Sequence, residues 1–145
     1  MSKVFDLDDR DLIPCSPDRL FNILLDVRSY YRWWPKEVKF ELAGDESMAQ
    51  VGAVIGMSPP FMKVWMRVIQ IDRPIVMIMD VFKGDYVGSA RWVLAPVAQS
   101  TELAYITTVR FTTLKMKLST LFVDVTEEHS KSMRQAFEGL KRYVK

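Results

Sequence analysis

Thiol and imidazole groups are almost absent from this chain, whose 145 residues include one cysteine, Cys15, and one histidine, His129. A single cysteine cannot form a disulfide within the chain, so a reducing compartment is the default expectation. Cys15 lies between Pro14 and Ser16, with no histidine near it in the sequence. Lone cysteines of this kind are usually packing residues, and we favour that interpretation over a catalytic nucleophile.

Long apolar runs and a leader-like N-terminus are also missing. No uninterrupted apolar segment approaches the ~18 residues that a membrane-spanning helix needs. The N-terminal MSKVFDLDDRDL is too acidic and too poor in apolar residues for a signal peptide. Together with the single cysteine, these absences predict a cytoplasmic protein without a membrane span.

The chain also has little excess charge of either sign. Twenty basic and eighteen acidic residues give a net charge of +2, and the basic residues are scattered. So small an excess does not favour nucleic-acid binding, and we expect none. A hydrophobic fraction of 49% and a charged fraction of 26% are ordinary for a soluble globular protein. The length fits one domain over residues 1–145.

Metal and cofactor motifs are missing as well. His, Cys and acidic residues nowhere cluster at metal-ligand spacing, and we expect no metal. The glycines fit neither nucleotide-binding motif, so we expect no cofactor.

The residues that are present predict a strand, a helix and then a run of strands. A polar strand is expected over 4–13, and Ser16 followed by Pro17 is typical of a helix start. The buried face of that helix is predicted to comprise Leu20, Phe21, Leu24 and Leu25. A short aromatic segment over 29–35 follows it, ended by Pro35. Beta-branched and aromatic residues separated by turn residues then predict antiparallel strands over 38–43, 50–56, 63–72, 75–82, 86–94 and 101–112.

The C-terminal region changes to helical spacing. Apolar residues recur every three or four positions and predict an amphipathic helix of about 20 residues. This stripe comprises Phe122, Val125, His129, Met133, Phe137, Leu140 and Val144. The opposite face is charged, and its Glu127–Lys131 and Glu138–Arg142 spacings favour ion pairs along the helix. Gly139 within the helix is expected to cost little.

The order of these elements and several local motifs resemble a known superfamily. The segments that carry the resemblance are IPCSPDRLF at 13–21, LDV at 25–27, WWP at 33–35, IDRP at 71–74, GSARWVLAP at 88–96 and TEL at 101–103. The chain resembles the SRPBCC superfamily of polyketide cyclases/dehydrases and lipid-transport proteins, whose fold is START-like or birch-pollen-allergen-like. The resemblance implies an α+β helix-grip fold. In that fold a curved antiparallel sheet of six to seven strands surrounds a long C-terminal helix, and two short helices follow the first strand. It also implies a cavity between the sheet and the helix.

Alternation along the strands predicts which side chains face that cavity. In the last strand Leu103, Tyr105, Thr107, Val109 and Phe111 share the inward face. Tyr86, Gly88, Ala90, Trp92 and Leu94 face inward from the strand before it, and Ile75, Met77, Met79 and Val81 from the one before that. In the 63–72 strand we assign Val64, Met66 and Val68 inward because Lys63 and Arg67 take the other face. A one-residue error there would turn Arg67 into the cavity.

We therefore predict a ligand-binding wall from the strands and the helix. It comprises Met66, Met77, Met79, Trp92, Leu103, Tyr105, Thr107, His129, Met133 and Phe137. Methionine side chains adapt to irregular apolar ligands, and a few polar groups among them are typical of a small-molecule site. The competing interpretation is a solid core, and the family resemblance favours a cavity.

Three functions fit this wall. The first is a carrier or binding protein for an apolar or aromatic small molecule, such as a lipid, an isoprenoid or a polyketide. The second is a cyclase, aromatase or dehydratase in which His129 and Tyr105 transfer protons, helped by an acid such as Asp124. Ser130, beside His129, is expected to point elsewhere on the helix. His129 itself either faces the ligand or is a rim residue satisfied by water.

A third function is a partner-binding module that uses the apolar segment Met57–Met62. This segment and the Leu- and Met-rich loop over 112–121 are more apolar than the resemblance implies. Both are expected to border a cavity mouth or to form a homodimer interface, because exposed apolar patches mark contact surfaces.

Overall fold

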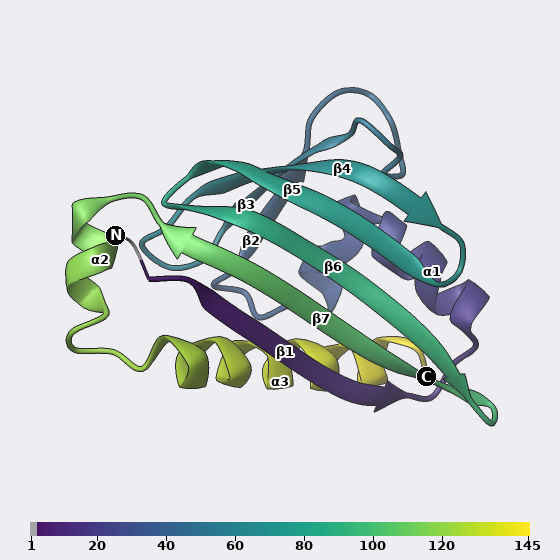
Figure 1. The fold of residues 1–145 in the computed structure, drawn as a ribbon. Helices are drawn as coiled ribbons and strands as arrows, with labels where there is room; N and C mark the ends of the chain where they lie inside the picture. The colour runs from purple at the N-terminus through teal and green to yellow at the C-terminus, as the bar shows by residue number, and fades with distance from the viewer. Residues whose placement is uncertain (1–2) are drawn as a thin grey trace.

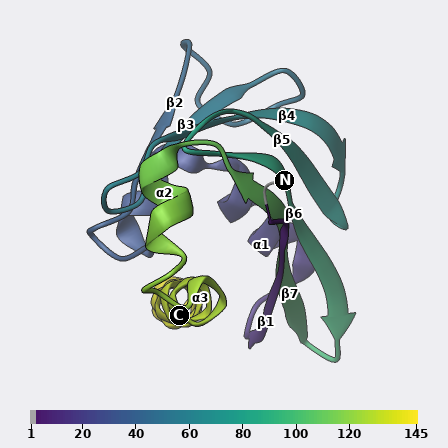
Figure 2. The ribbon, with the colours of Figure 1, turned by 60° about the vertical axis from the view of Figure 1, so that its left-hand side comes forward.

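The structure is a computed structural model that describes residues 3–145. Seven antiparallel strands form one curled sheet in the order β1-β7-β6-β5-β4-β3-β2, and the sheet wraps around the C-terminal helix α3 (Figures 1 and 2). The strands are β1 (Phe5–Ile13), β2 (Lys39–Leu42), β3 (Val54–Ser58), β4 (Val64–Asp72), β5 (Val76–Gly84), β6 (Tyr86–Val97) and β7 (Ser100–Phe111). The helices are α1 (Pro17–Leu25), the 3₁₀ helix η1 (Val27–Arg32), α2 (Leu114–Ser119) and α3 (Val125–Tyr143). The predicted α+β helix-grip fold is confirmed.

Helix α1 forms where the capping pattern predicts it. The Ser16 side chain accepts a hydrogen bond from the backbone N–H of Arg19, and Pro17 occupies the first turn. All four predicted apolar residues of this helix are buried. The helix therefore closes one end of the concave side of the sheet.

The predicted inward face of the sheet is largely confirmed. Alternate residues of β7 from Leu103 to Phe111 are buried, as are Met77, Met79 and Val81 of β5 and Val64, Met66 and Val68 of β4. Arg67 is exposed, so the assignment of the β4 faces is correct. Ile75 is the exception, with 58% of its surface exposed. Its N–H donates to the Asp72 carbonyl in the turn before β5, so it lies outside the strand alternation.

Several boundaries differ from the predictions, among them the end of β6, which runs to Val97 and not to Leu94. Helix α3 begins at Val125, because the Asp124 carboxylate caps it by accepting from the N–H of Glu127. Phe122 therefore lies in the preceding loop and is 87% exposed, so its predicted place on the helix stripe is wrong. The segment predicted as a loop over 112–121 contains the short helix α2. Strand β3 starts at Val54, because residues 50–53 form a turn in which Ala53 donates to Gln50.

Gly139 brings α3 against the aromatic segment that follows α1. A Cβ atom at this position would lie 2.0 Å from the backbone carbonyl oxygen of Trp33. Real Cβ atoms do not approach an oxygen this closely, so only glycine lets the helix pack at this distance. Gly139 is therefore a packing requirement, where the sequence indicated only a tolerated helix residue.

The core divides into two clusters of buried apolar residues. The larger one joins α1, η1, the middle of the sheet and most of α3. The smaller one comprises Phe5, Leu7, Val109 and Phe111, with Met62, Tyr86, Met116 and Val125 packed against it.

Within residues 3–145, no helix is long and apolar enough to cross a bilayer.

Candidate functional site

A cavity of about 420 Å³ lies where the two core clusters meet. Its volume falls in the ~300–1,000 Å³ range of small-molecule sites. Strand β7 and helix α3 supply two of its sides, and Leu7 of β1 and Trp34 and Val38 add to the lining. The segment Met57–Met62 and the region from α2 to the start of α3 complete it, through Met57, Pro59, Pro60, Phe61, Met62, Met116, Ser119, Val123 and Val125. Both apolar segments singled out in the sequence therefore border the cavity.

The polar groups of the lining gather where β7 faces α3. They are Tyr105 and Thr107 from the strand and Glu128, His129 and Ser132 from the helix, whereas Ser119 of α2, Tyr86 of β6 and the Trp34 indole N–H are further polar groups of the lining. The rest of the lining is almost entirely apolar. A bound molecule would therefore meet polar groups mainly at one side and hydrocarbon elsewhere.

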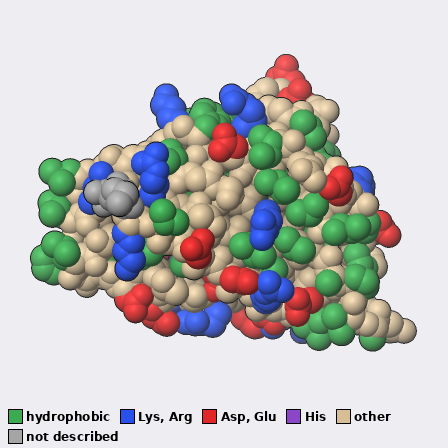
Figure 3. Space-filling view, in the orientation of Figure 1, with side chains coloured by type: hydrophobic (Ala, Val, Ile, Leu, Met, Phe, Trp, Pro, Cys, Tyr) green, Lys and Arg blue, Asp and Glu red, His purple; other side chains and the backbone are tan. Residues whose placement is uncertain are grey.

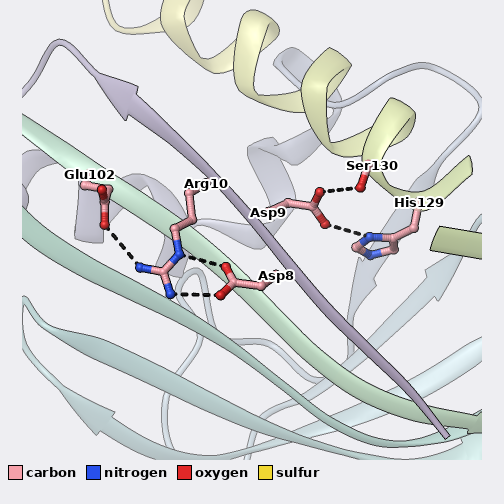
Figure 4. A network of polar contacts seen from close by, with 6 residues as sticks. All are labelled: Asp8, Asp9, Arg10, Glu102, His129 and Ser130. Atoms are coloured by element: carbon pink, nitrogen blue, oxygen red, sulfur yellow. Dashed lines mark hydrogen bonds and ion pairs between the residues drawn. The ribbon is translucent and has the colours of Figure 1, made fainter. Parts of the chain in front are cut away.

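The single histidine is held by an acid from the edge strand. The Nδ1 atom of His129 lies 2.9 Å from Oδ2 of Asp9 on β1, and the Ser130 hydroxyl donates to the other carboxylate oxygen at 2.7 Å. Figure 4 shows the Asp9 carboxylate between these two partners. The expectation that Ser130 points elsewhere is wrong, because both neighbours on the helix reach the same carboxylate.

The charge state of Asp9 determines whether Nδ1 of His129 donates or accepts the hydrogen bond between them. Partial burial acts to raise the pKa of the Asp9 carboxyl, but hydrogen bonds from His129 and Ser130 and the nearby positive charges outweigh it. The pKa therefore lies below its ordinary value, and Asp9 is ionised at neutral pH. An ionised carboxylate only accepts hydrogen bonds, so Nδ1 of His129 carries the hydrogen between the two groups, and Nε2 is the ring nitrogen left for another partner.

Tyr105 lies beside this histidine. The two rings are nearly parallel, at 11°, with centroids 6.2 Å apart. Burial raises the pKa of the Tyr105 hydroxyl above its ordinary value, so the group stays protonated at neutral pH and can donate a hydrogen bond.

Two further polar atoms of lining residues have no partner. In the part of the chain that the structure describes, the Thr107 hydroxyl and the Trp34 indole N–H are buried without a hydrogen bond. An unsatisfied buried polar atom costs about 1–3 kcal/mol. Because Thr107 and Trp34 line the cavity, a small side-chain rotation toward a bound polar group would recover part of that cost.

The structure divides the predicted wall into two groups. Tyr105, Thr107, His129 and Met133 line the cavity. The other six are buried in the main core and do not contribute to the lining; they are Met66, Met77, Met79, Trp92, Leu103 and Phe137. The cavity lies toward the end of the sheet at which β7 leads into α2. The sequence indicated a position near the middle of the sheet, but tryptophan and methionine side chains fill that region.

Other candidate groups lie away from this chemistry. Asp124 is the N-cap of α3, and its carboxylate accepts from the backbone N–H of Glu127 instead of facing the cavity. Cys15 is buried, and burial raises the pKa of its thiol, so it is a poor nucleophile at neutral pH. Among residues 3–145, no three or more His, Cys, Asp or Glu side chains lie close enough together to hold a metal ion.

Sequence reasoning missed Asp9, and a signal for it was available. Asp9 and Asp11 are spaced by even numbers of residues from the buried Phe5, Leu7 and Ile13, so they share the inward face of β1. An acid on such a face needs a partner. Both acids have partners on α3. The Lys141 ammonium lies 2.8 Å from the Asp11 carboxylate, and His129 and Ser130 contact Asp9.

The architecture defines a class: the chain has the SRPBCC-type fold, with a curled antiparallel sheet gripping a C-terminal helix. Among solved structures it is similar to the protein TTHA0849 from Thermus thermophilus, with a TM-score of 0.77, 17% identity and 97% of each chain covered. It is similar to a START superfamily protein from Mycobacterium smegmatis, with a TM-score of 0.73, 13% identity and 96% of each chain covered. It is also similar to the ginseng major latex-like protein 151 from Panax ginseng, with a TM-score of 0.71, 11% identity and 97% of each chain covered.

The TM-scores establish the fold, and identities this low do not establish a shared function. No protein-family model matches the sequence, and no curated protein matches it as a relative.

Proposed function

We propose that this chain binds an apolar or aromatic small molecule in the cavity between β7 and α3, as a carrier or binding protein. Lipids, isoprenoids and polyketide-like compounds are the candidate ligands. The observation that carries the proposal is the asymmetry of the lining: an apolar enclosure with polar groups at the side where Tyr105 meets His129. The helix-grip fold, which the chain shares with solved structures from bacteria and from ginseng, provides the enclosure between the sheet and the helix.

The physical basis is burial of the ligand's hydrocarbon. Each square ångström of apolar surface removed from water contributes about 25 cal/mol. At the polar side the Tyr105 hydroxyl offers a donor, and His129, Thr107, Glu128 and Ser132 add further polar groups. A ligand with a single hydroxyl, carbonyl or carboxyl group at one end fits this pattern best.

Filling the cavity tests the proposal. Val109 lines it from β7, whereas Val87 on β6 pairs with Arg110 and lies on the opposite face of the sheet. We expect Val109→Trp to weaken binding of cis-parinaric acid, a fluorescent fatty acid, at least about tenfold, because the indole occupies ligand space. Val87→Trp is the matched control and should bind as the natural protein does. Equal binding by both variants would contradict the assignment of the cavity.

A second candidate function is favoured by the Asp9–His129 pair. A carboxylate that fixes a histidine tautomer is a common arrangement in general acid–base catalysis, and Tyr105 adds a proton donor beside it. The corresponding activity is a cofactor-independent cyclization, aromatization or dehydration of a polyketide-like substrate. His129→Gln would then abolish turnover of a poly-β-ketone substrate while its binding persists. Loss of neither activity nor binding would remove this candidate.

A single domain over residues 1–145 and a cytoplasmic location stay predictions from the sequence. So do the absence of nucleic-acid binding and the homodimer alternative. A homodimer that buries Met57–Met62 would compete with ligand entry, since this segment borders the cavity.

A further inference from the structure

We propose that the end of the molecule at the cavity mouth docks on an anionic lipid bilayer, with α2, the 120–124 loop and the turn at Phe61 as the contacting parts. This inference rests on the proposed function, since it names the place from which an apolar ligand enters. Its test below separates failure of docking from failure of ligand binding.

The mouth carries the most exposed large apolar side chains of the described chain. Phe61 is 91% exposed, Phe122 87%, Leu121 73% and Leu114 71%, and Leu118 and Val123 are about half exposed. In Figure 3 hydrophobic side chains protrude at the left edge, where α2 lies in Figure 1. Clustered apolar groups of this size on a water-facing surface mark a contact site.

The same two segments also form the inner surface of the cavity. Met116, Ser119 and Val123 line it from the α2 side, and Pro59, Pro60 and Met62 from the opposite turn. A hydrogen bond from the Lys115 ammonium to the Phe61 carbonyl, 3.0 Å long, links the two. Separation of these segments in a bilayer would therefore open the cavity directly toward lipid.

Basic residues surround this apolar mouth. Among the described residues, Lys3, Lys83, Arg110 and Lys117 have no acidic partner within 4.0 Å. Lys3 and Arg110 flank the pairing of Phe5 with Val109 at this end of β1 and β7. Lys83, near the end of β5, lies close to α2, because Thr113, just before α2, donates to Asp85 in the β5–β6 turn at 3.1 Å. Basic side chains near a bilayer attract anionic headgroups.

The nearby acids are mostly engaged within the protein. Asp85 accepts from the backbone N–H of Lys63 and pairs with Lys115. Asp124 caps α3 and Glu127 pairs with Arg134, whereas Glu128 borders the cavity with an exposed side chain. The outward-facing charge beside α2 is therefore predominantly positive.

The distribution of charge favours a bilayer over a second copy of this chain. A twofold dimer through the mouth would bring the patch of one copy against the same patch of the other. The unpaired lysines would then face one another, at an unfavourable Coulomb energy. An anionic bilayer instead offers hydrocarbon for Phe61 and Phe122 and negative charge for the lysines.

Vesicle co-sedimentation tests the proposal with the full chain. Vesicles of phosphatidylcholine mixed with phosphatidylserine are compared with vesicles of phosphatidylcholine alone. We expect binding to the anionic vesicles that weakens with salt and falls at least about tenfold in the double variant Leu121→Ser/Phe122→Ser, whose two residues are exposed and do not line the cavity. The matched control is Ile69→Ser/Ile75→Ser, which removes two exposed apolar side chains from β4 and the turn after it. Lys117→Glu should weaken binding to the anionic vesicles only.

Three outcomes would overturn the proposal: no binding to either vesicle, equal loss in both double variants, or dimerisation through the patch without vesicle binding. Dimerisation is read from sedimentation velocity of the natural protein and the Leu121→Ser/Phe122→Ser variant. Binding of cis-parinaric acid without vesicles is measured on the same samples. Retained ligand binding with lost docking supports the role of the surface, and docking by a protein that binds no ligand would overturn the link to the cavity.

Discussion

Asp9 and His129, 120 residues apart in the chain, lie 2.9 Å apart at the border of the cavity. The contact fastens the edge strand β1 to the long helix α3, and the Lys141–Asp11 pair repeats the connection further along the helix. The same contact sets the tautomer of the only imidazole in the protein. A single interaction thus contributes to closing the helix grip and to preparing the polar side of the cavity.

The low pKa of Asp9 predicts how stability depends on pH. An acid whose folded-state pKa is below its unfolded value stabilises the fold above the unfolded pKa, near 4. That contribution is lost as pH falls through the folded-state pKa. Asp9→Asn should therefore lower the free energy of unfolding by about 1–3 kcal/mol at pH 7, and the difference should shrink below about pH 4.

Urea unfolding across this pH range measures the effect. Asp8→Asn is the matched control, since Asp8 forms an exposed pair with Arg10, and such pairs contribute about 0–1 kcal/mol. A constant difference between the natural protein and Asp9→Asn from pH 7 to about pH 2 would contradict the proposed role of the carboxylate.

The free Nε2 atom of His129 predicts a ligand-dependent titration. Because a bound polar group changes the partner of the ring, the NMR titration of His129 should shift when cis-parinaric acid saturates the protein. His129→Gln should change affinity or turnover while the fold persists. An identical titration with and without the ligand, together with normal binding by the Gln variant, would make His129 a rim residue satisfied by water.

Phe137 tests the packing of α3 against the sheet. Its side chain is 2% exposed within the main core. Phe137→Ala should cost about 3–5 kcal/mol of unfolding free energy, because it removes a large buried side chain and leaves a cavity. The exposed neighbour Gln135→Ala should change little. An unchanged melting temperature in Phe137→Ala would be incompatible with this packing.

Gly139 predicts a reversal of the usual helix preference. In an exposed helix interior, alanine is more favourable than glycine by about 1 kcal/mol. Here the added Cβ would meet the Trp33 carbonyl oxygen, so Gly139→Ala should lower the melting temperature. Gln135→Ala again serves as the control for the helix itself. Stabilisation by Gly139→Ala would mean that α3 does not approach the aromatic segment as described.

Local patterns predicted most of this fold because they reflect rules that act over a few residues. The alternation in 101–112 identified the buried face of β7, since neighbouring side chains of a strand point to opposite sides. Ser16 and Pro17 indicated the start of α1, because capping acts within one helical turn. Local rules failed at Ile75, which lies in a turn beside a strand, and at α2, whose six residues have no side-chain cap.

The site was harder to predict because it depends on how distant elements meet. Asp9 reaches His129 only because β1 pairs with β7 at the sheet edge that α3 crosses. The position of the cavity depends on which bulky side chains fill the core. Met66, Met77 and Met79 are as apolar as Met57, Met62 and Met116, and only the packed structure distinguishes core from lining.

That distinction provides the most direct test of the central claim, that a ligand occupies the cavity between β7 and α3. With ¹³C-labelled methionine methyl groups, NMR spectra are recorded during titration with cis-parinaric acid. Met57, Met62, Met116 and Met133 should shift strongly, because they line the cavity, and Met66, Met77 and Met79 should shift little. The largest shifts at the three core methionines, or no shift at any methionine, would contradict the account.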